Sequence, residues 1–217
     1  LHSFPTRRSS DLSALHSQGK GTRIPRSECW LLRFCPGTEW KGSLKVVAAP
    51  YRKEIMRVII LGNAGAGKST LARKLMGQEK ASRLSLDEVA FQGSAQRRPL
   101  QDSIDDVKRW IDGQESWIIE GCYADIMESI LDFCDELIFL NPGVDACLAH
   151  CRTRPWEPDK FRSREEQDSN LDNLLAWVAT YETRKDEYGL LRHIALFDSF
   201  AGRKREFPLP SEYDSIP

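Results

Sequence analysis

A run of nine residues has the composition needed to hold a phosphate group. It reads Gly62, Asn63, Ala64, Gly65, Ala66, Gly67, Lys68, Ser69 and Thr70. The run matches the pattern G-x-x-x-x-G-K-[ST] and follows an apolar segment, residues 56–61. Its glycines allow backbone N–H groups to approach phosphate oxygens closely, and the helix that it opens adds the unpaired N–H groups of a first turn. We call residues 62–70 the glycine loop and expect all nine to bind the phosphates of a nucleotide.

Two side chains of the glycine loop bring chemistry of their own. Lys68 can reach the β- and γ-phosphates as a mobile point charge, and the Ser69 hydroxyl is a typical Mg²⁺ ligand. We therefore predict ATP and Mg²⁺ as cofactors, with Ser69 as the protein ligand of the metal. A glycine-rich turn with a chance lysine is the alternative, which the full match between a strand and a helix disfavours.

The segments that must position this loop alternate between apolar strands and amphipathic helices. We predict strands at 56–61, 83–86, 117–119, 136–140 and 194–197. Helices are expected at 69–76 and 102–113. A third helix should run through residue 151, with Asn141 as its N-cap and Pro142 in its first turn, and a fourth, long helix should follow a Ser163–Glu166 capping box. Continuous apolar strands joined by helices predict an α/β fold with a parallel sheet buried on both faces.

Composition and charge narrow the class of protein. The chain has 217 residues, of which 41% are hydrophobic and 29% are charged, and no apolar run approaches the 18 or so residues of a membrane helix. Residues 1–55 contain 10 of the 31 basic residues but 4 of the 32 acidic ones, so residues 56–217 carry a formal net charge of −7. This balance makes direct binding to nucleic acid unfavourable, because phosphate contacts need a basic face. We expect a cytoplasmic protein with no membrane contact.

The first quarter of the chain differs from the rest. Residues 1–12 resemble a translated sequencing-library adapter, the first methionine is Met56, and residues 13–55 show neither helical nor strand periodicity. We expect residues 1–55 to be a non-native or disordered extension, with a transit peptide as the alternative, and residues 56–217 to form the domain.

The cysteines indicate a reducing compartment rather than a disulfide scaffold or a metal site. Cys147 and Cys151 flank His150, which could suggest metal ligation. However, Val144, Cys147, Leu148 and Cys151 have the spacing of the buried stripe of a helix. We therefore predict that these two thiols are packed in the core.

The remaining question for the domain is which kind of nucleotide chemistry it performs. The chain has no Asn-Lys-x-Asp guanine-recognition motif, so a GTPase is disfavoured. A domain of residues 56–217 is also small for a motor or a mechanical ATPase. A kinase of small molecules fits best, and such an enzyme needs an acceptor site and a mobile cationic cover over the transferred phosphate.

Four segments resemble the small P-loop kinases related to adenylate and shikimate kinases, particularly the group labelled DNA topology modulation or flagellar accessory proteins. These segments are residues 56–70, 86–91, 117–123 and 151–154. The resemblance covers about residues 56–207. It implies a three-layer P-loop NTPase fold with a five-stranded parallel sheet and helices on both faces, an acceptor bound over the carboxyl ends of the strands, and a lid between the later helices.

The resemblance also assigns two carboxylates. Asp87 matches the acceptor-side Asp of the family, and its alternative role is the N-cap of the next turn. Glu120 stands where family members usually carry the Asp of Asp-Gly-Asn-Tyr, whereas this chain reads Glu120-Gly121-Cys122-Tyr123. The longer carboxylate can still contact a metal or a hydroxyl, but Cys122 lacks the amide of the family's Asn. The resemblance therefore leaves the acceptor open.

The lid candidate spans residues 152–164, where basic residues outnumber acidic ones and two prolines indicate a loop. Guanidinium groups such as those of Arg152 and Arg154 suit a transition state with charge spread over phosphoryl oxygens, and the alternative is a solvated basic surface. We expect Trp110, Trp117, Trp156 and Trp177 to pack in the core or lid. The segment 198–200 would follow the last strand, where such kinases hold adenine.

Two functions are thus open. The first is an ATP-dependent phosphotransferase that acts on a small-molecule acceptor, with Lys68, Asp87, Glu120, Arg152 and Arg154 as its catalytic residues. The second is a nucleotide-binding regulatory ATPase that acts on a protein or DNA partner. The sequence does not give the oligomeric state.

Overall fold

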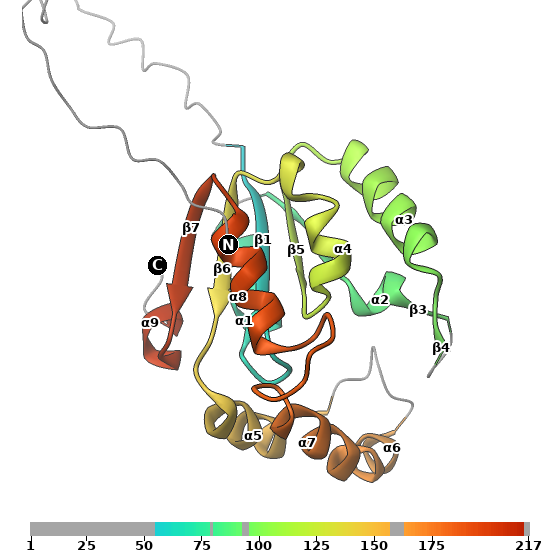
Figure 1. Cartoon of the computed structure of the whole chain (residues 1–217), viewed down its shortest axis with the longest axis vertical. Coiled ribbons are helices and arrows are strands. Elements are labelled where there is room, and N and C mark those ends of the chain that lie inside the picture. Colours follow the sequence, from blue (N-terminus) through green and yellow to red (C-terminus); the bar gives the residue numbers. More distant parts are fainter. Residues whose placement is uncertain (1–54, 79, 93–95, 157–162, 215–217) are drawn as a thin grey trace, which may run out of the picture. The chain divides into compact units, whose positions relative to one another are not determined.

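Five strands form one parallel sheet in the computed structural model of the chain (Figure 1). The structure describes residues 55–78, 80–92, 96–156 and 163–214, which all belong to one unit, Tyr51–Pro217. The strands are β1 (Arg57–Gly62), β2 (Ser82–Ser85), β5 (Trp117–Gly121), β6 (Glu136–Leu140) and β7 (Arg203–Phe207), in the order β2-β5-β1-β6-β7. The central strand β1 pairs with β5 on one side and with β6 on the other, so the glycine loop emerges from the middle of the sheet.

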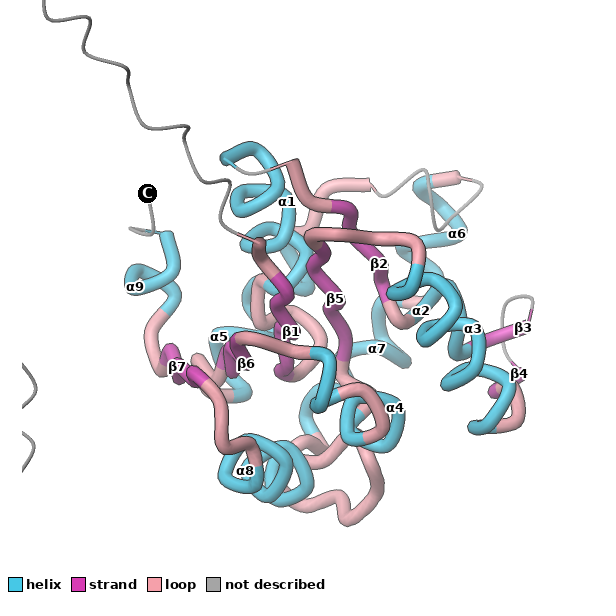
Figure 2. The backbone as a smooth tube through the Cα atoms, turned by 90° about the horizontal axis from the view of Figure 1, so that it is seen from above, coloured by secondary structure: helices cyan, strands magenta, loops and turns pink. Residues whose placement is uncertain are grey.

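Helices cover both faces of this sheet, which gives three layers (Figure 2). Alternate residues of β1 face opposite layers, because successive side chains of a strand point to opposite sides. Val58 and Ile60 pack with α1 (Lys68–Gln78), while Ile59 and Leu61 join the core shared with α3 (Leu100–Asp112), α4 (Ala124–Glu128) and α8 (Leu190–Ser199). The predicted α/β fold with a five-stranded parallel sheet between layers of helices is confirmed, although the edge strand β7 is exposed rather than buried.

A further group of helices lies at the end of the sheet to which the strands point (Figure 1). These are α5 (Val144–Thr153), α6 (Arg164–Ser169) and α7 (Leu171–Ala179). The remaining elements are α2 (Asp87–Ala90), the short antiparallel pair β3 (Phe91–Gln92) and β4 (Gln96–Arg97), a 3-10 turn at Leu131–Phe133, and α9 (Pro210–Asp214). Among the residues described, no helix combines the length and apolar character that crossing a bilayer requires.

The prediction of the last strand was wrong. Residues 194–197 lie inside α8, and the fifth strand is the charged segment Arg203–Phe207, which pairs with β6. As the edge of the sheet, β7 tolerates exposed charge, and its Arg203 and Arg205 both pair with the buried Glu136 of β6. Residues 198–200 consequently end a helix rather than follow a strand, so the adenine position expected there has no basis.

Two helix starts also differ from expectation. The helix α5 begins at Val144 with Gly143 at its N-cap, where φ is +86°, whereas the side chain of Asn141 donates to Glu206 of β7. Ser163 does cap α6, since its hydroxyl accepts from the N–H of Glu166 at 3.2 Å. The expected long helix nevertheless breaks at Asn170 into α6 and α7.

Candidate functional site

The glycine loop connects β1 to α1 at the carboxyl end of the sheet. Its three glycines, Gly62, Gly65 and Gly67, have φ values of +154°, +79° and +93°. A side chain is disfavoured at such angles because its Cβ crowds the backbone, so these positions use the conformational freedom that only glycine has. The strand, the loop and the helix therefore have the order and local geometry that the sequence predicted.

Neighbouring elements press against the loop where its glycines lie. A Cβ on Gly62 would lie 2.4 Å from the carbonyl oxygen of Leu140, and a Cβ on Gly65 would lie 2.4 Å from that of Cys147. The glycine loop is thus enclosed between the end of β6 and the helix α5. At its far end, a Cβ on Gly67 would approach the ring of Tyr213 in α9 to 3.1 Å.

The side chain of Lys68 folds back over the loop. Its Nζ donates to the carbonyl oxygen of Asn63 at 2.8 Å, and the residue is 9% exposed. Asn63 is fully enclosed as well: its Oδ1 accepts from the N–H of Ala64, and its Nδ2 donates to the carbonyl of Val178 in α7. The Asn63 side chain therefore ties the loop to α7, a role that the sequence motif did not indicate.

Ser69 and Glu120 meet at the first turn of α1. The Ser69 hydroxyl donates to Oε1 of Glu120 at 2.8 Å, and the same oxygen accepts from Nη2 of Arg83 at 2.5 Å. Glu120 is 3% exposed at the end of β5, next to β1 in the sheet. The contact brings a predicted metal ligand and a predicted catalytic carboxylate together.

The donor set of this pair suits magnesium. Mg²⁺ prefers oxygen ligands and is commonly held by one or two protein groups, with water and substrate phosphates completing its shell. The hydroxyl of Ser69 and the carboxylate of Glu120 are such oxygens, and Arg83 would share the carboxylate. No group of three or more His, Cys, Asp or Glu side chains with the arrangement of a metal site occurs in the described part of the chain.

Asp87 lies just after the end of β2. In the sheet, β2 lies on one side of β5, and β1, which leads into the glycine loop, lies on the other. Its Oδ1 accepts a hydrogen bond of 2.5 Å from the hydroxyl of Tyr123, and its side chain is exposed. The N-cap of α2 is Leu86, and no side chain caps that helix. The alternative role of Asp87 as an N-cap is therefore not realised, and its carboxylate faces the segment that follows β5.

Cys122 directly follows β5 and is buried. Burial raises the pKa of its thiol to about 12. Four charged groups also act on that thiol: Lys68, Asp87, Glu120 and Arg184. The electrostatic influences on this thiol thus come from both predicted catalytic carboxylates, from the loop lysine and from Arg184, which the sequence analysis did not select.

The helix α5, whose C-terminal end carries the lid candidates Arg152 and Arg154, contacts the glycine loop. Its His150 contacts the carbonyl oxygen of Gly65 through Nδ1 at 2.8 Å, and Cys147 and Cys151 are buried against the same glycine. The predicted buried stripe of thiols is confirmed. Arg152 is exposed in the last turn of this helix, and Arg154 is its half-buried C-cap. The other basic residues between Arg154 and Arg164 fall within residues 157–162, which lie outside the described residues.

Several aromatic and arginine residues near the site were not predicted to have a role. They are Arg97 of β4, Tyr123, Trp177 of α7, and Arg184 and Tyr188 of the segment between α7 and α8. Trp177 was expected to pack, and it does so against the guanidinium of Arg184. Of the other tryptophans, Trp117 is fully buried and Trp156 is 43% exposed.

A cavity of about 220 Å³ lies apart from this site, among residues at the amino ends of the strands. It is lined by Arg57, Ile111, Asp112, Gln114, Trp117 and Phe133. None of these residues belongs to the glycine loop, and none forms one of the hydrogen bonds of the loop given above.

Comparison with known proteins leaves these assignments to the sequence and the geometry. No protein-family model matches the chain, and a search of curated proteins finds no match.

Proposed function

We propose that the chain is a P-loop phosphotransferase that moves the γ-phosphoryl group of ATP to a small-molecule acceptor. The observation that supports this most is the contact of Ser69 with Glu120, because it joins the first turn behind a Gly-x-x-x-x-Gly-Lys-Ser loop to a buried carboxylate on the neighbouring strand. Open parallel sheets bind their ligands beyond the carboxyl ends of the strands, which is where this pair lies.

The roles follow from the positions. Backbone N–H groups of the glycine loop and the ammonium of Lys68 would neutralise the phosphates, after Lys68 exchanges the carbonyl of Asn63 for a phosphate oxygen. Ser69 and Glu120 would hold Mg²⁺, which when bound neutralises charge between the β- and γ-phosphates. These residues account for nucleotide binding, and they are shared by kinases and ATPases alike.

Asp87 favours transfer to an acceptor over simple hydrolysis. Its carboxylate is exposed and is oriented by the hydroxyl of Tyr123. Asp87 lies on the side of β5 that faces away from β1. A carboxylate so held can orient an acceptor hydroxyl and take its proton as the oxygen attacks phosphorus. Arg152 and Arg154, at the end of the helix that contacts the loop, would stabilise the charge on the transferred group.

The test is an acceptor screen that follows ATP consumption and phosphorylated product separately. We expect a hydroxylated acceptor to raise ATP turnover, Lys68→Ala to weaken nucleotide binding and nearly abolish turnover, and Asp87→Asn to lose transfer with nucleotide affinity intact. Asp172→Asn, an exposed carboxylate in the first turn of α7, is the matched control. Turnover of Lys68→Ala within a few-fold of the wild type would contradict the proposal.

Hydrolysis that no acceptor stimulates would instead support a regulatory ATPase with a protein partner. We expect the reaction in the cytoplasm, because the four cysteines of the described residues are all free thiols.

A further inference from the structure

Two arginines and three aromatic rings form a stack beside Cys122. The guanidinium of Arg184 lies 4.3 Å from the ring centre of Trp177 and 5.1 Å from that of Tyr188. The guanidinium of Arg97 lies 5.6 Å from the same Tyr188 ring and 4.8 Å from that of Tyr123. We call these five residues the arginine–aromatic stack. It joins α7, the segment before α8, β4 and the segment after β5.

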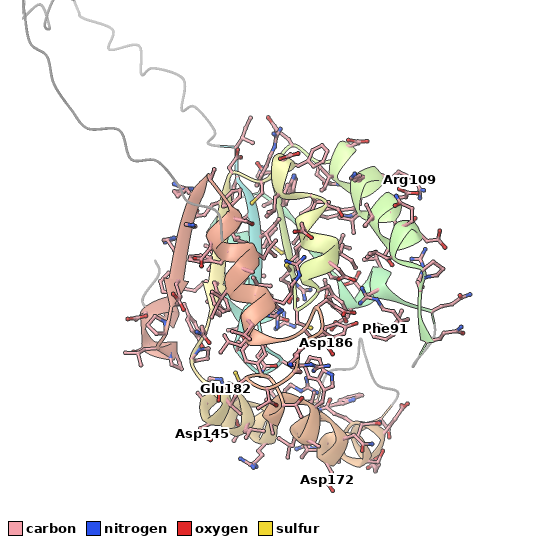
Figure 3. All side chains as sticks on the ribbon, viewed as in Figure 1. Phe91, Arg109, Asp145, Asp172, Glu182 and Asp186 are labelled. Carbon is pink, nitrogen blue, oxygen red and sulfur yellow. The ribbon has the colours of Figure 1, made fainter. Side chains whose placement is uncertain are left out.

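The guanidinium of Arg184 is held in one orientation. Its Nε and Nη2 donate to the two carboxylate oxygens of Asp186, each at 2.8 Å, and its side chain is 15% exposed. Figure 3 shows Asp186 in the segment between α7 and the sheet. Gly189 packs on the Arg184 backbone so closely that a Cβ there would lie 2.5 Å from its carbonyl oxygen. This fork geometry uses two of the five N–H donors of Arg184, one on Nε and one on Nη2, and leaves both N–H groups of Nη1 outside the pair.

The third nitrogen of that guanidinium has no hydrogen-bond partner in the described part of the chain. Nη1 of Arg184 is buried and makes no hydrogen bond to any described residue. Buried donors in native proteins are nearly always paired, and a charged donor without a partner is costlier than a neutral one. Its neighbours in the stack present ring faces, which do not replace an anionic acceptor. Such a donor fits an oxygen anion that arrives with a ligand.

The position of this nitrogen relates it to the acceptor side. Tyr123, at the other end of the stack, donates to Asp87, and the N–H of Ala124 donates to the carbonyl of Glu187 in the Arg184 segment. The stack therefore lies beside the carboxylate that would orient the acceptor hydroxyl.

We propose that Nη1 of Arg184 receives an anionic oxygen of the acceptor, so that the acceptor is a small molecule with both a hydroxyl and a phosphate or carboxylate group. The identification of this ligand as the phosphoryl acceptor rests on the proposed function, whereas binding of an anion at Arg184 can be tested without turnover. Arg97 is a positioning residue here: its Nη1 donates to the Tyr188 hydroxyl and its Nη2 to Asp125, which fixes the ring that lies between the two guanidiniums.

Binding is tested first, without nucleotide or catalysis. Inorganic phosphate and acetate are titrated by calorimetry into the wild type, Lys68→Ala, Arg184→Gln and Arg192→Gln. Arg192 is the matched control, because it is a partly exposed arginine of α8 that pairs with Glu128. We expect phosphate to retain a binding component in Lys68→Ala that Arg184→Gln loses by about tenfold or more in affinity. Arg192→Gln should bind as the wild type does.

Gly189→Ala gives a second test that leaves the charge in place. Its methyl group would displace the Arg184 backbone, so we expect the same phosphate component to weaken while the melting temperature shows that the protein is folded. Acetate binding of equal strength would indicate a carboxylate site, and phosphate binding alone a phosphate site. Phosphate binding that is equal in the wild type and Arg184→Gln, or absent in the wild type, would overturn the proposal.

Turnover then separates this proposal from the proposed function. With an acceptor in hand, Arg184→Gln should raise the acceptor KM about tenfold or more with the Kd for ATP unchanged. An unchanged acceptor KM would refute the anion site and leave the phosphotransferase intact. A phosphate site lost in Arg184→Gln, in a protein that transfers no phosphoryl group, would refute the phosphotransferase and leave the anion site intact.

Discussion

Acid should destabilise this fold through His193 before its carboxylates titrate. The imidazole is fully buried in α8, with Nδ1 2.8 Å from the hydroxyl of Tyr181 and Nε2 3.0 Å from the carbonyl oxygen of Cys122. A neutral ring satisfies both contacts, because Nε2–H donates to the carbonyl while Nδ1 accepts from the tyrosine. A second proton would sit on Nδ1 and oppose the Tyr181 O–H, which would have to turn away.

The size of the effect follows from the pKa of His193. Burial lowers this pKa from 6.5 to about 4. Between these values the unfolded chain binds a proton that the folded chain does not, so the free energy of unfolding falls as pH drops through 6.5 and the loss is complete below about 4. A difference of 2.5 pKa units corresponds to about 3 kcal/mol in total, of which about 2 kcal/mol is lost between pH 7.5 and pH 5.

Urea unfolding across that pH range measures it. His193→Gln places an amide oxygen and nitrogen near the two ring nitrogens and does not titrate, so it should remove the slope whatever it costs at pH 7.5. We expect the wild type to lose about 2 kcal/mol more than the variant from pH 7.5 to pH 5. Equal pH dependence in the two proteins would refute the assignment of a neutral buried His193.

Two other predictions concern packing and charge. Gly65→Ala combines a positive φ with the contact against α5 and should cost about 2–5 kcal/mol of unfolding free energy. The control Gly77→Ala, in α1 with open space around it, should be neutral or stabilising. Equal melting temperatures of these two variants would argue against the enclosed loop. Glu136→Gln removes the buried charge that pairs with Arg203 and Arg205, so hydrogen exchange of the β7 amides should quicken by about tenfold or more. Unchanged exchange there would show that backbone pairing alone holds the edge strand.

The parts of the site that local chemistry determines could be predicted from sequence. The glycine loop is one continuous segment whose φ angles and helix start depend on its own residues, and it was placed correctly. The neighbourhood of Glu120 followed from a general rule of parallel sheets, since β5 and β1 are adjacent. What the rule could not supply was the direct contact of Ser69 with Glu120, which depends on the conformations of both side chains.

The fifth strand was missed because pattern and burial disagree at an edge. Residues 194–197 are apolar and short, a combination that periodicity cannot assign to a strand or a helix. The inward residues of α8 include His193, whose polarity interrupts the apolar stripe on which the helix would have been recognised. In β7, by contrast, exposed arginine and lysine side chains hide a strand that pairs on one side only.

The arginine–aromatic stack left no signal that sequence reading could use. Arg97, Tyr123 and Arg184 are far apart in the chain, and each has the composition of an ordinary surface or core position. Their proximity depends on how the segment before α8 crosses toward β5, through the hydrogen bond of Ala124 with Glu187. Only tertiary structure brings such contacts together.

The walls of the glycine loop set a limit on how the chain can change elsewhere. Backbone oxygens of Leu140 and Cys147 occupy the space that a Cβ of Gly62 or Gly65 would need. Backbone atoms, unlike a side chain, cannot make room by changing rotamer. The eight residues from Leu140 to Cys147 therefore act as a spacer of fixed length between two walls of the loop. Lengthening this β6–α5 connection by even one residue would move one wall relative to the other, so a segment outside the glycine loop should tolerate insertion as poorly as the loop itself.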